Sequence, residues 1–96
     1  MWIMNQAETE VYNSDFFDHF LIVDKPDAKL VVASKGRDTT PYTLGRYADM
    51  PEAREVLGAL RYALTADKAS FDMPLSEKAA PEHMVYDKRT RRKGGS

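Results

Sequence analysis

Residues 49–66 constrain the fold more than any other part of this 96-residue chain. Asp49 can cap the first turn of a helix, Pro51 lies where its missing N–H does no harm, and Glu52 completes an aspartate version of the capping box. Apolar residues then recur at the spacing of one helical face. They are Ala53, Val56, Leu57, Leu60 and Leu64. The pattern predicts one amphipathic helix, which needs an apolar surface to cover.

Predicted strands that precede and follow this helix in the sequence supply the apolar surface. Three runs rich in β-branched and aromatic residues are bounded by turn formers, as strands typically are; they are residues 19–24, 29–34 and 42–47. Residues 1–6 and the stretch around Val11 predict two shorter strands, residues 14–17 a turn, and residues 70–73 a final edge strand. The predicted fold class is α+β, with one small antiparallel sheet of four to five strands and one amphipathic helix packed across it.

Two glycines lie inside predicted elements. Gly45 interrupts a strand, where glycine marks a bulge or the close approach of another backbone, and the neighbour expected here is the helix. Gly58 lies within the helix, at a cost of about 1 kcal/mol relative to alanine. Close packing, and not catalysis, is the expected reason for Gly58.

Charge divides the chain into two parts. Five of its 14 basic residues lie close together near the C-terminus, and they are Lys88, Arg89, Arg91, Arg92 and Lys93. Residues 1–87 hold the other nine basic residues and all 15 acidic ones, a net charge of −6. We expect a single α+β domain over residues 1–75 and a poorly ordered polar tail over residues 76–96 with a basic end.

Several classes of protein are excluded or unsupported by composition. The chain has no cysteine, so it has no disulfide, thiolate nucleophile or cysteine-ligated metal. Its longest apolar runs are far shorter than the roughly 20 residues that cross a bilayer, and the first ten residues do not resemble a secretory signal. No glycine-rich phosphate-binding motif is present. We expect a cytoplasmic protein with no membrane partner and no cofactor.

The residue types of a hydrolase triad occur in Ser14, Asp18 and His19. A triad is defined by geometry and an oxyanion hole, and no G-x-S-x-G elbow is present, so a surface histidine is the favoured interpretation. His19 and His83 lack the H-E-x-x-H spacing and a nearby carboxylate cluster. The prediction is no catalytic residue, no metal site and no enzymatic activity, with a small hydrolase using His19 as an alternative.

Four short pieces of the chain carry a resemblance to known proteins. They are Trp2-Ile3 followed by Gln6, the Leu44-Gly45-Arg46-Tyr47 strand, the helix residues Ala53, Val56, Leu57 and Leu60, and Phe71-Asp72-Met73-Pro74. Together they resemble a group of short uncharacterised proteins of Gram-positive bacteria and their phages. This resemblance implies an α+β fold and a bacterial or prophage origin, and it implies no chemistry.

The same strand followed by a capped helix is also similar to the strand-to-helix corner of small plant and integrase-type DNA-binding sheets. Those sheets carry several arginines on the DNA-facing side. Here only Arg37 and Arg46 lie in or near the comparable strands. DNA reading by the sheet is therefore not expected.

Aromatic residues outnumber what one helix on a small sheet can cover. They include Trp2, Tyr12, Phe16, Phe17, Phe20, Tyr42, Tyr47 and Tyr62. Core packing accounts for most of them, and the remainder are expected to form a surface for self-association or for a protein partner. The leading hypothesis is a non-catalytic protein-interaction or accessory module, with a homodimer as one form of it.

The basic run supports an alternative function. Five cations between residues 88 and 93 would displace counterions from a polyanion, which gives salt-dependent, sequence-nonspecific nucleic-acid binding. A solubilising end is the other interpretation of the same residues. The nucleic-acid-binding residues on this hypothesis are Lys88, Arg89, Arg91, Arg92 and Lys93.

Overall fold

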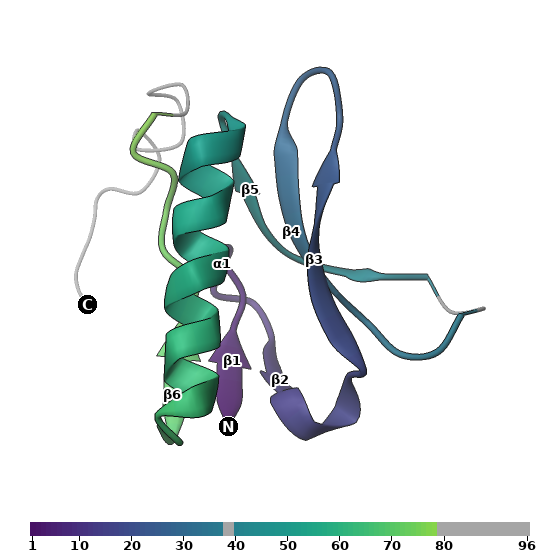
Figure 1. Cartoon of the computed structure of the whole chain (residues 1–96), viewed down its shortest axis with the longest axis vertical. Coiled ribbons are helices and arrows are strands. Elements are labelled where there is room, and N and C mark those ends of the chain that lie inside the picture. The colour runs from purple at the N-terminus through teal and green to yellow at the C-terminus, as the bar shows by residue number, and fades with distance from the viewer. Residues whose placement is uncertain (38–39, 79–96) are drawn as a thin grey trace.

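The computed structural model describes residues 1–37 and 40–78 (Figure 1). The N-terminal half holds β1 Trp2–Met4, β2 Val11–Asn13, the 3-10 turn η1 Ser14–Phe16, β3 His19–Asp24 and β4 Lys29–Ser34. It is followed by β5 Tyr42–Tyr47, the helix α1 Met50–Thr65 and β6 Ser70–Asp72. The bounds of β3, β4, β5 and α1 lie within one residue of the predicted ones, because hydrophobic periodicity and turn residues mark these elements clearly.

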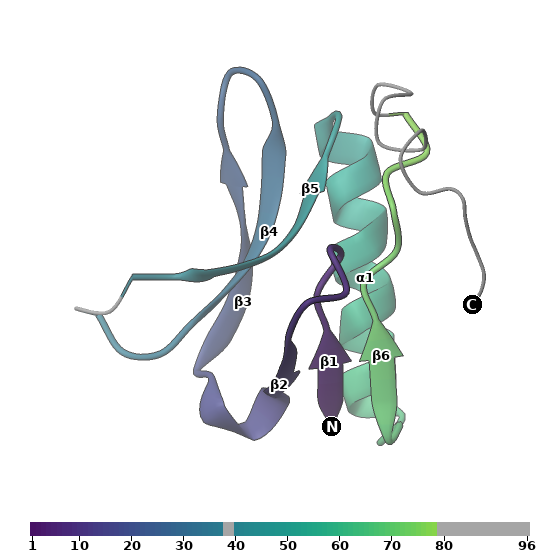
Figure 2. The same cartoon turned by 180° about the vertical axis from the view of Figure 1, so that it is seen from behind.

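The strands form two sheets, where one was predicted. The first has the order β3-β4-β5 and is antiparallel throughout, and the second has the order β2-β1-β6. Within the second sheet β1 pairs antiparallel with β2 but parallel with β6. The α+β class with one packed helix is confirmed. The single antiparallel sheet is wrong, because the chain returns after α1 to run beside β1 in the same direction, away from β5 (Figure 2).

The helix has the N-cap that its sequence predicts, but the Glu52 side chain accepts from Ala48 N at 2.9 Å, one residue before the bond to Asp49 N that a capping box has. The Asp49 carboxylate accepts a hydrogen bond from the Glu52 N–H at 3.0 Å, so Asp49 is the N-cap. The helix contacts both sheets, through β3, β4 and β5 on one side and β6 on the other. The helix therefore packs against the first and the second sheet at once (Figures 1 and 2).

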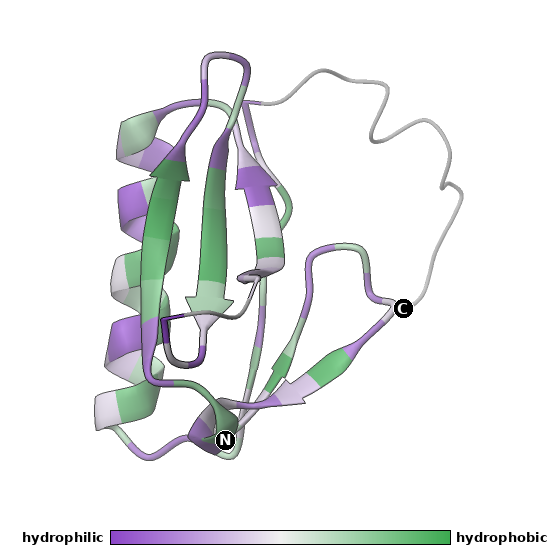
Figure 3. Ribbon diagram, turned by 90° about the vertical axis from the view of Figure 1, so that its right-hand side faces the viewer, coloured by the Kyte–Doolittle hydropathy of each residue, from purple (hydrophilic) through white to green (hydrophobic). Residues whose placement is uncertain are grey.

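One hydrophobic core lies between the helix and the two sheets. Its buried members are Ile3, Val31, Ala33, Leu44, Tyr47, Ala53, Val56, Leu60 and Met73. Ala53, Val56 and Leu60 of the predicted helical stripe are buried, while Leu57 and Leu64 are only partly buried against this core. The β3 and β4 ribbons are hydrophobic along most of their length (Figure 3), and alternation directs Phe20 and Ile22 of β3 toward the core.

The bulge expected at Gly45 is present, but the expected neighbour of Gly45 and the expected reason for Gly58 are wrong. Val31 pairs with Gly45 but Val32 pairs with Thr43, so Leu44 is an extra residue in β5 and the predicted bulge lies directly beside Gly45. The neighbour at Gly45 is not the helix: a Cβ there would lie 2.6 Å from the Tyr47 hydroxyl oxygen. At Gly58 a Cβ would meet nothing within 4 Å, so close packing does not explain this glycine.

Candidate functional site: an aromatic cluster and a polar strap

Five aromatic side chains meet where β2, η1, β3 and β5 converge. This aromatic cluster consists of Tyr12, Phe16, Phe17, Phe20 and Tyr42, and its ring centroids lie 5.2 to 6.5 Å apart in edge-to-face pairs. Such pairs contribute about 0.5–1.5 kcal/mol each beyond the area they bury. Three of the rings pack partly against the core. The other two, Phe16 and Tyr42, remain 48% and 42% exposed.

Local sequence chemistry holds these rings in place. The Asn13 side chain accepts from the Asp15 N–H at 3.0 Å and so caps η1, the turn that presents Phe16. The Gly36 N–H donates to the Asp18 carboxylate at 2.5 Å, which ties the end of β4 to the segment after η1. Gly36 has a φ of 69°, a value that glycine adopts without strain. The aromatic cluster is therefore supported by the cap of η1 and by the link between the residues after β4 and the residues after η1.

The surroundings of the aromatic cluster carry both signs of charge. The Lys35 ammonium lies 5.0 Å from the centroid of the Phe16 ring, a cation–π distance. The Tyr12 hydroxyl donates to the Glu10 carboxylate. Burial, followed by this hydrogen bond and the negative charge of Glu10, raises the pKa of Tyr12 to about 12. Tyr12 thus presents a neutral phenol at every ordinary pH, and the surface combines apolar rings with charges at its rim.

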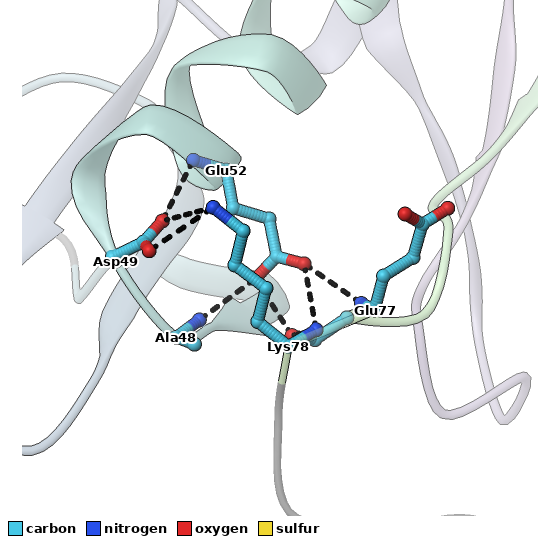
Figure 4. Close-up of polar contacts among 6 residues, drawn as sticks. Ala48, Asp49, Glu52, Glu77 and Lys78 are labelled. Atoms are coloured by element: carbon cyan, nitrogen blue, oxygen red, sulfur yellow. Dashed lines mark hydrogen bonds and ion pairs between the residues drawn. The ribbon is translucent and has the colours of Figure 1, made fainter.

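A second polar arrangement lies at the opposite end of the molecule, where α1 begins (Figure 1). Residues 73–78, here called the strap, run from β6 to this end of the helix. Glu52, which is 7% exposed, accepts hydrogen bonds from Ala48 N at 2.9 Å, Ser76 Oγ at 2.6 Å, Glu77 N at 2.7 Å and Lys78 N at 3.2 Å (Figure 4). Lys78 Nζ also lies 3.2 Å from the Asp49 carboxylate.

These contacts lower the pKa values of the Asp49 and Glu52 carboxyl groups. Burial raises the pKa of Glu52, but the hydrogen bonds from Ser76 and from three backbone N–H groups outweigh it and leave the pKa below its ordinary value. The pKa of Asp49 is lowered, first by the Glu52 N–H and then by Lys78. Both groups are therefore ionised near neutral pH. The sequence predicted the helix cap, but it gave no sign that Glu52 also holds residues more than 20 positions away, since that contact depends on where β6 ends.

The predicted nucleic-acid-binding residues lie outside the described part of the chain. These are Lys88, Arg89, Arg91, Arg92 and Lys93, and His83 lies outside it as well. The predicted tail over residues 76–96 begins within the described chain, and Ser76, Glu77 and Lys78 are bound to Glu52.

The triad residue types are not assembled in the described structure. Ser14 is buried, the Asp18 carboxylate accepts from Gly36, and His19 is exposed at the start of β3. Over residues 1–37 and 40–78, no hydrogen bond joins any two of these three side chains. The same residues contain no group of three His, Asp or Glu side chains that could hold a metal ion.

The remaining aromatic residues divide between core and surface. Tyr47 is buried, and its hydroxyl donates to the Pro74 carbonyl at 2.8 Å. Trp2 and Tyr62 are more than half exposed and lie outside the aromatic cluster. In the described residues, no helix has the length and apolar character that crossing a membrane requires. Comparisons with protein-family models, with curated proteins and with solved structures gave no match.

Proposed function

We propose that this protein is a non-catalytic interaction module and that its binding surface is the aromatic cluster. The observation that carries the proposal is the exposure of Phe16 and Tyr42, at 48% and 42%, within a set of rings that are otherwise packed together. Exposed aromatic side chains held rigidly by neighbours are well suited to anchor a protein interface, because they bury a large area at little cost in conformational entropy.

The partner that fits this surface is another polypeptide with an apolar or aromatic side chain to pack against the exposed parts of the Phe16 and Tyr42 rings. The rings supply apolar area, and Lys35 and Glu10 contact rings of the cluster, so charges of both signs border this surface. A second copy of the chain offers the same rings and charges and is one such partner. The bacterial or prophage setting and the cytoplasmic location belong to this proposal and rest on sequence alone.

Two measurements test the aromatic surface. Sedimentation equilibrium from about 1 to 200 μM compares the wild type with Phe16→Ala and Tyr42→Ala, and with Tyr62→Ala as a control at an exposed tyrosine outside the cluster. Panning a random 12-residue peptide display library against the wild type and the same variants covers partners other than a second copy. The proposal expects self-association or a selected peptide family that is lost in the cluster variants and kept in Tyr62→Ala. Binding that survives both cluster substitutions, or no binding in either assay, would reject it.

A second candidate function follows from the sequence of the C-terminal run. Five cations between residues 88 and 93 contrast with a net charge of −6 over residues 1–87, so nucleic-acid binding through the run is the alternative. Fluorescent single- and double-stranded oligonucleotides are titrated at low and moderate salt with the full chain and with a chain in which all five cations are replaced by glutamine. Salt-dependent binding only by the wild type supports this function, and no binding at low salt rejects it.

A further inference from the structure

We propose that the strap, residues 73–78, is a latch that opens from the folded core as a unit, and that the ionised Glu52 carboxylate holds it closed. The proposal does not depend on the aromatic cluster, which lies at the other end of the molecule (Figure 1). It concerns how the C-terminal part of the chain is attached to the domain.

Four hydrogen-bond donors surround the Glu52 carboxylate. One carboxylate oxygen accepts from Ala48 N and Ser76 Oγ, and the other accepts from Glu77 N and Lys78 N (Figure 4). Only an ionised carboxylate can accept on both oxygens without carrying a hydrogen of its own. A neutral acid or an amide at this position places a donor against at least one of these donor pairs, which removes bonds and adds repulsion.

Polar contacts, more than buried apolar area, hold the strap. Within it only Met73 is buried, and Pro74, Leu75, Glu77 and Lys78 are exposed. Its other attachments include a hydrogen bond from Met73 N to the Met4 carbonyl at 3.0 Å, and hydrogen bonds to the Pro74 carbonyl from Tyr47 Oη at 2.8 Å and Gln6 Nε2 at 3.2 Å. Segments with few buried apolar contacts open at a lower free energy than the core does.

Titratable groups face Glu52 from each neighbouring element. Asp49 lies at the helix start, Tyr47 on β5, and Glu77 and Lys78 on the strap. If Glu52 becomes neutral, the remaining charged attachment is the Lys78–Asp49 pair, whose side chains are 53% and 45% exposed. Exposed ion pairs contribute little, so this pair cannot hold the strap by itself.

Amide hydrogen exchange measured by NMR on the full-length protein tests the latch. The variant is Glu52→Gln and the matched control is Glu55→Gln, an exposed glutamate on the same helix. Protection factors of Glu77 and Lys78 report on the strap, and those of Val31 and Leu60 report on the core. We expect Glu52→Gln to lower strap protection by roughly tenfold or more, as loss of bonds to a charged group does, while core protection and the control stay near wild type.

Two further measurements keep the test decisive if Glu52→Gln folds poorly. Ser76→Ala removes one donor and leaves the carboxylate, so strap protection should fall by less, again with the core unchanged. In the wild type, titration from pH 7 to pH 3 should lower strap protection before core protection. Strap and core amides that lose protection together, or strap amides that do not respond to the charge of Glu52, would overturn the proposal.

Discussion

At the scale of single residues, the Gln6 side chain joins the two sheets. Its Nε2 donates to the Arg46 carbonyl at 3.0 Å and to the Pro74 carbonyl at 3.2 Å, and its Oε1 accepts from Arg46 N at 2.8 Å. The backbone N–H of Gln6 donates to the Leu44 carbonyl at 2.7 Å. Gln6 therefore pairs with the outer edge of β5 as a strand residue would, and it also reaches the strap.

This arrangement predicts that Gln6→Glu is destabilising although it keeps the size of the side chain. A glutamate still accepts from Arg46 N, but it cannot donate to the two carbonyls and places negative charge beside them. We expect the free energy of unfolding in urea to fall by about 1–2 kcal/mol at pH 7, the sum of two modest hydrogen bonds. Glu8→Gln is the control for a unit change of charge in the same loop. A Gln6→Glu protein as stable as the wild type would show that the donated bonds contribute nothing.

The two glycines inside regular elements predict opposite responses to alanine. At Gly58 an added Cβ meets nothing within 4 Å, so Gly58→Ala should stabilise the protein by about 0.5–1 kcal/mol through helix propensity. At Gly45 the new Cβ would lie 2.6 Å from the Tyr47 hydroxyl oxygen, so the buried tyrosine must move away from the Pro74 carbonyl. Thermal and urea unfolding should rank Gly58→Ala above the wild type and Gly45→Ala below it. The reverse order would contradict both assignments.

At the scale of elements, the helix holds the two sheets together through a few buried side chains. Leu60 is 0% exposed, and Leu60→Ala should lower the free energy of unfolding by roughly 2–5 kcal/mol because it leaves a cavity. Tyr62 lies two residues further along and is 66% exposed, so Tyr62→Ala should change stability far less. Urea unfolding of both variants measures the difference. Equal losses would mean that the core does not lie on the Leu60 side of α1.

Most elements of this fold could be predicted from the sequence, but their pairing could not. Residues 42–47 and the Asp49 cap are specified by alternation and by capping chemistry, both of which act within a few residues. The parallel pairing of β1 with β6 depends on contacts between Ile3 and Phe71, which are far apart in the chain, and on the position of Gln6 beside β5. No local pattern encodes such pairings, so two sheets were not distinguished from one.

The same difference between local and long-range information applies to the candidate site. The excess of aromatic residues predicted an exposed subset, but sequence alone could not separate Phe16 and Tyr42, which are exposed, from Tyr47, which is buried. Tyr42 and Tyr47 lie at opposite ends of β5, where Tyr42 packs against Phe17 in the aromatic cluster and Tyr47 lies in the core with its hydroxyl on the Pro74 carbonyl. The role of Glu52 beyond the helix cap was missed for a related reason, since it depends on the path of the strap.

At the scale of the whole molecule, two tyrosines make stability depend on alkaline pH. Burial, and then the charge of Glu52, raises the pKa of Tyr47 well above the ordinary value of 10, and the pKa of Tyr12 is raised to about 12. Above pH 10 the unfolded chain loses these phenol protons while the folded chain keeps them. The contribution is therefore fully present below pH 10 and is lost as pH rises through the folded pKa values.

Tyr47→Phe separates this titration from the hydrogen bond that the hydroxyl makes. At pH 7 the variant should be less stable by about 1 kcal/mol, because the Pro74 carbonyl loses a donor. Between pH 10 and pH 12 its stability should fall less steeply than that of the wild type, since one of the two shifted phenols is gone. Tyr62→Phe, which removes an exposed hydroxyl, should match the wild type at both ends of the range. Urea unfolding at several pH values measures both quantities, and equal alkaline slopes for Tyr47→Phe and the wild type would show that the Tyr47 phenol titrates alike in the folded and unfolded chains.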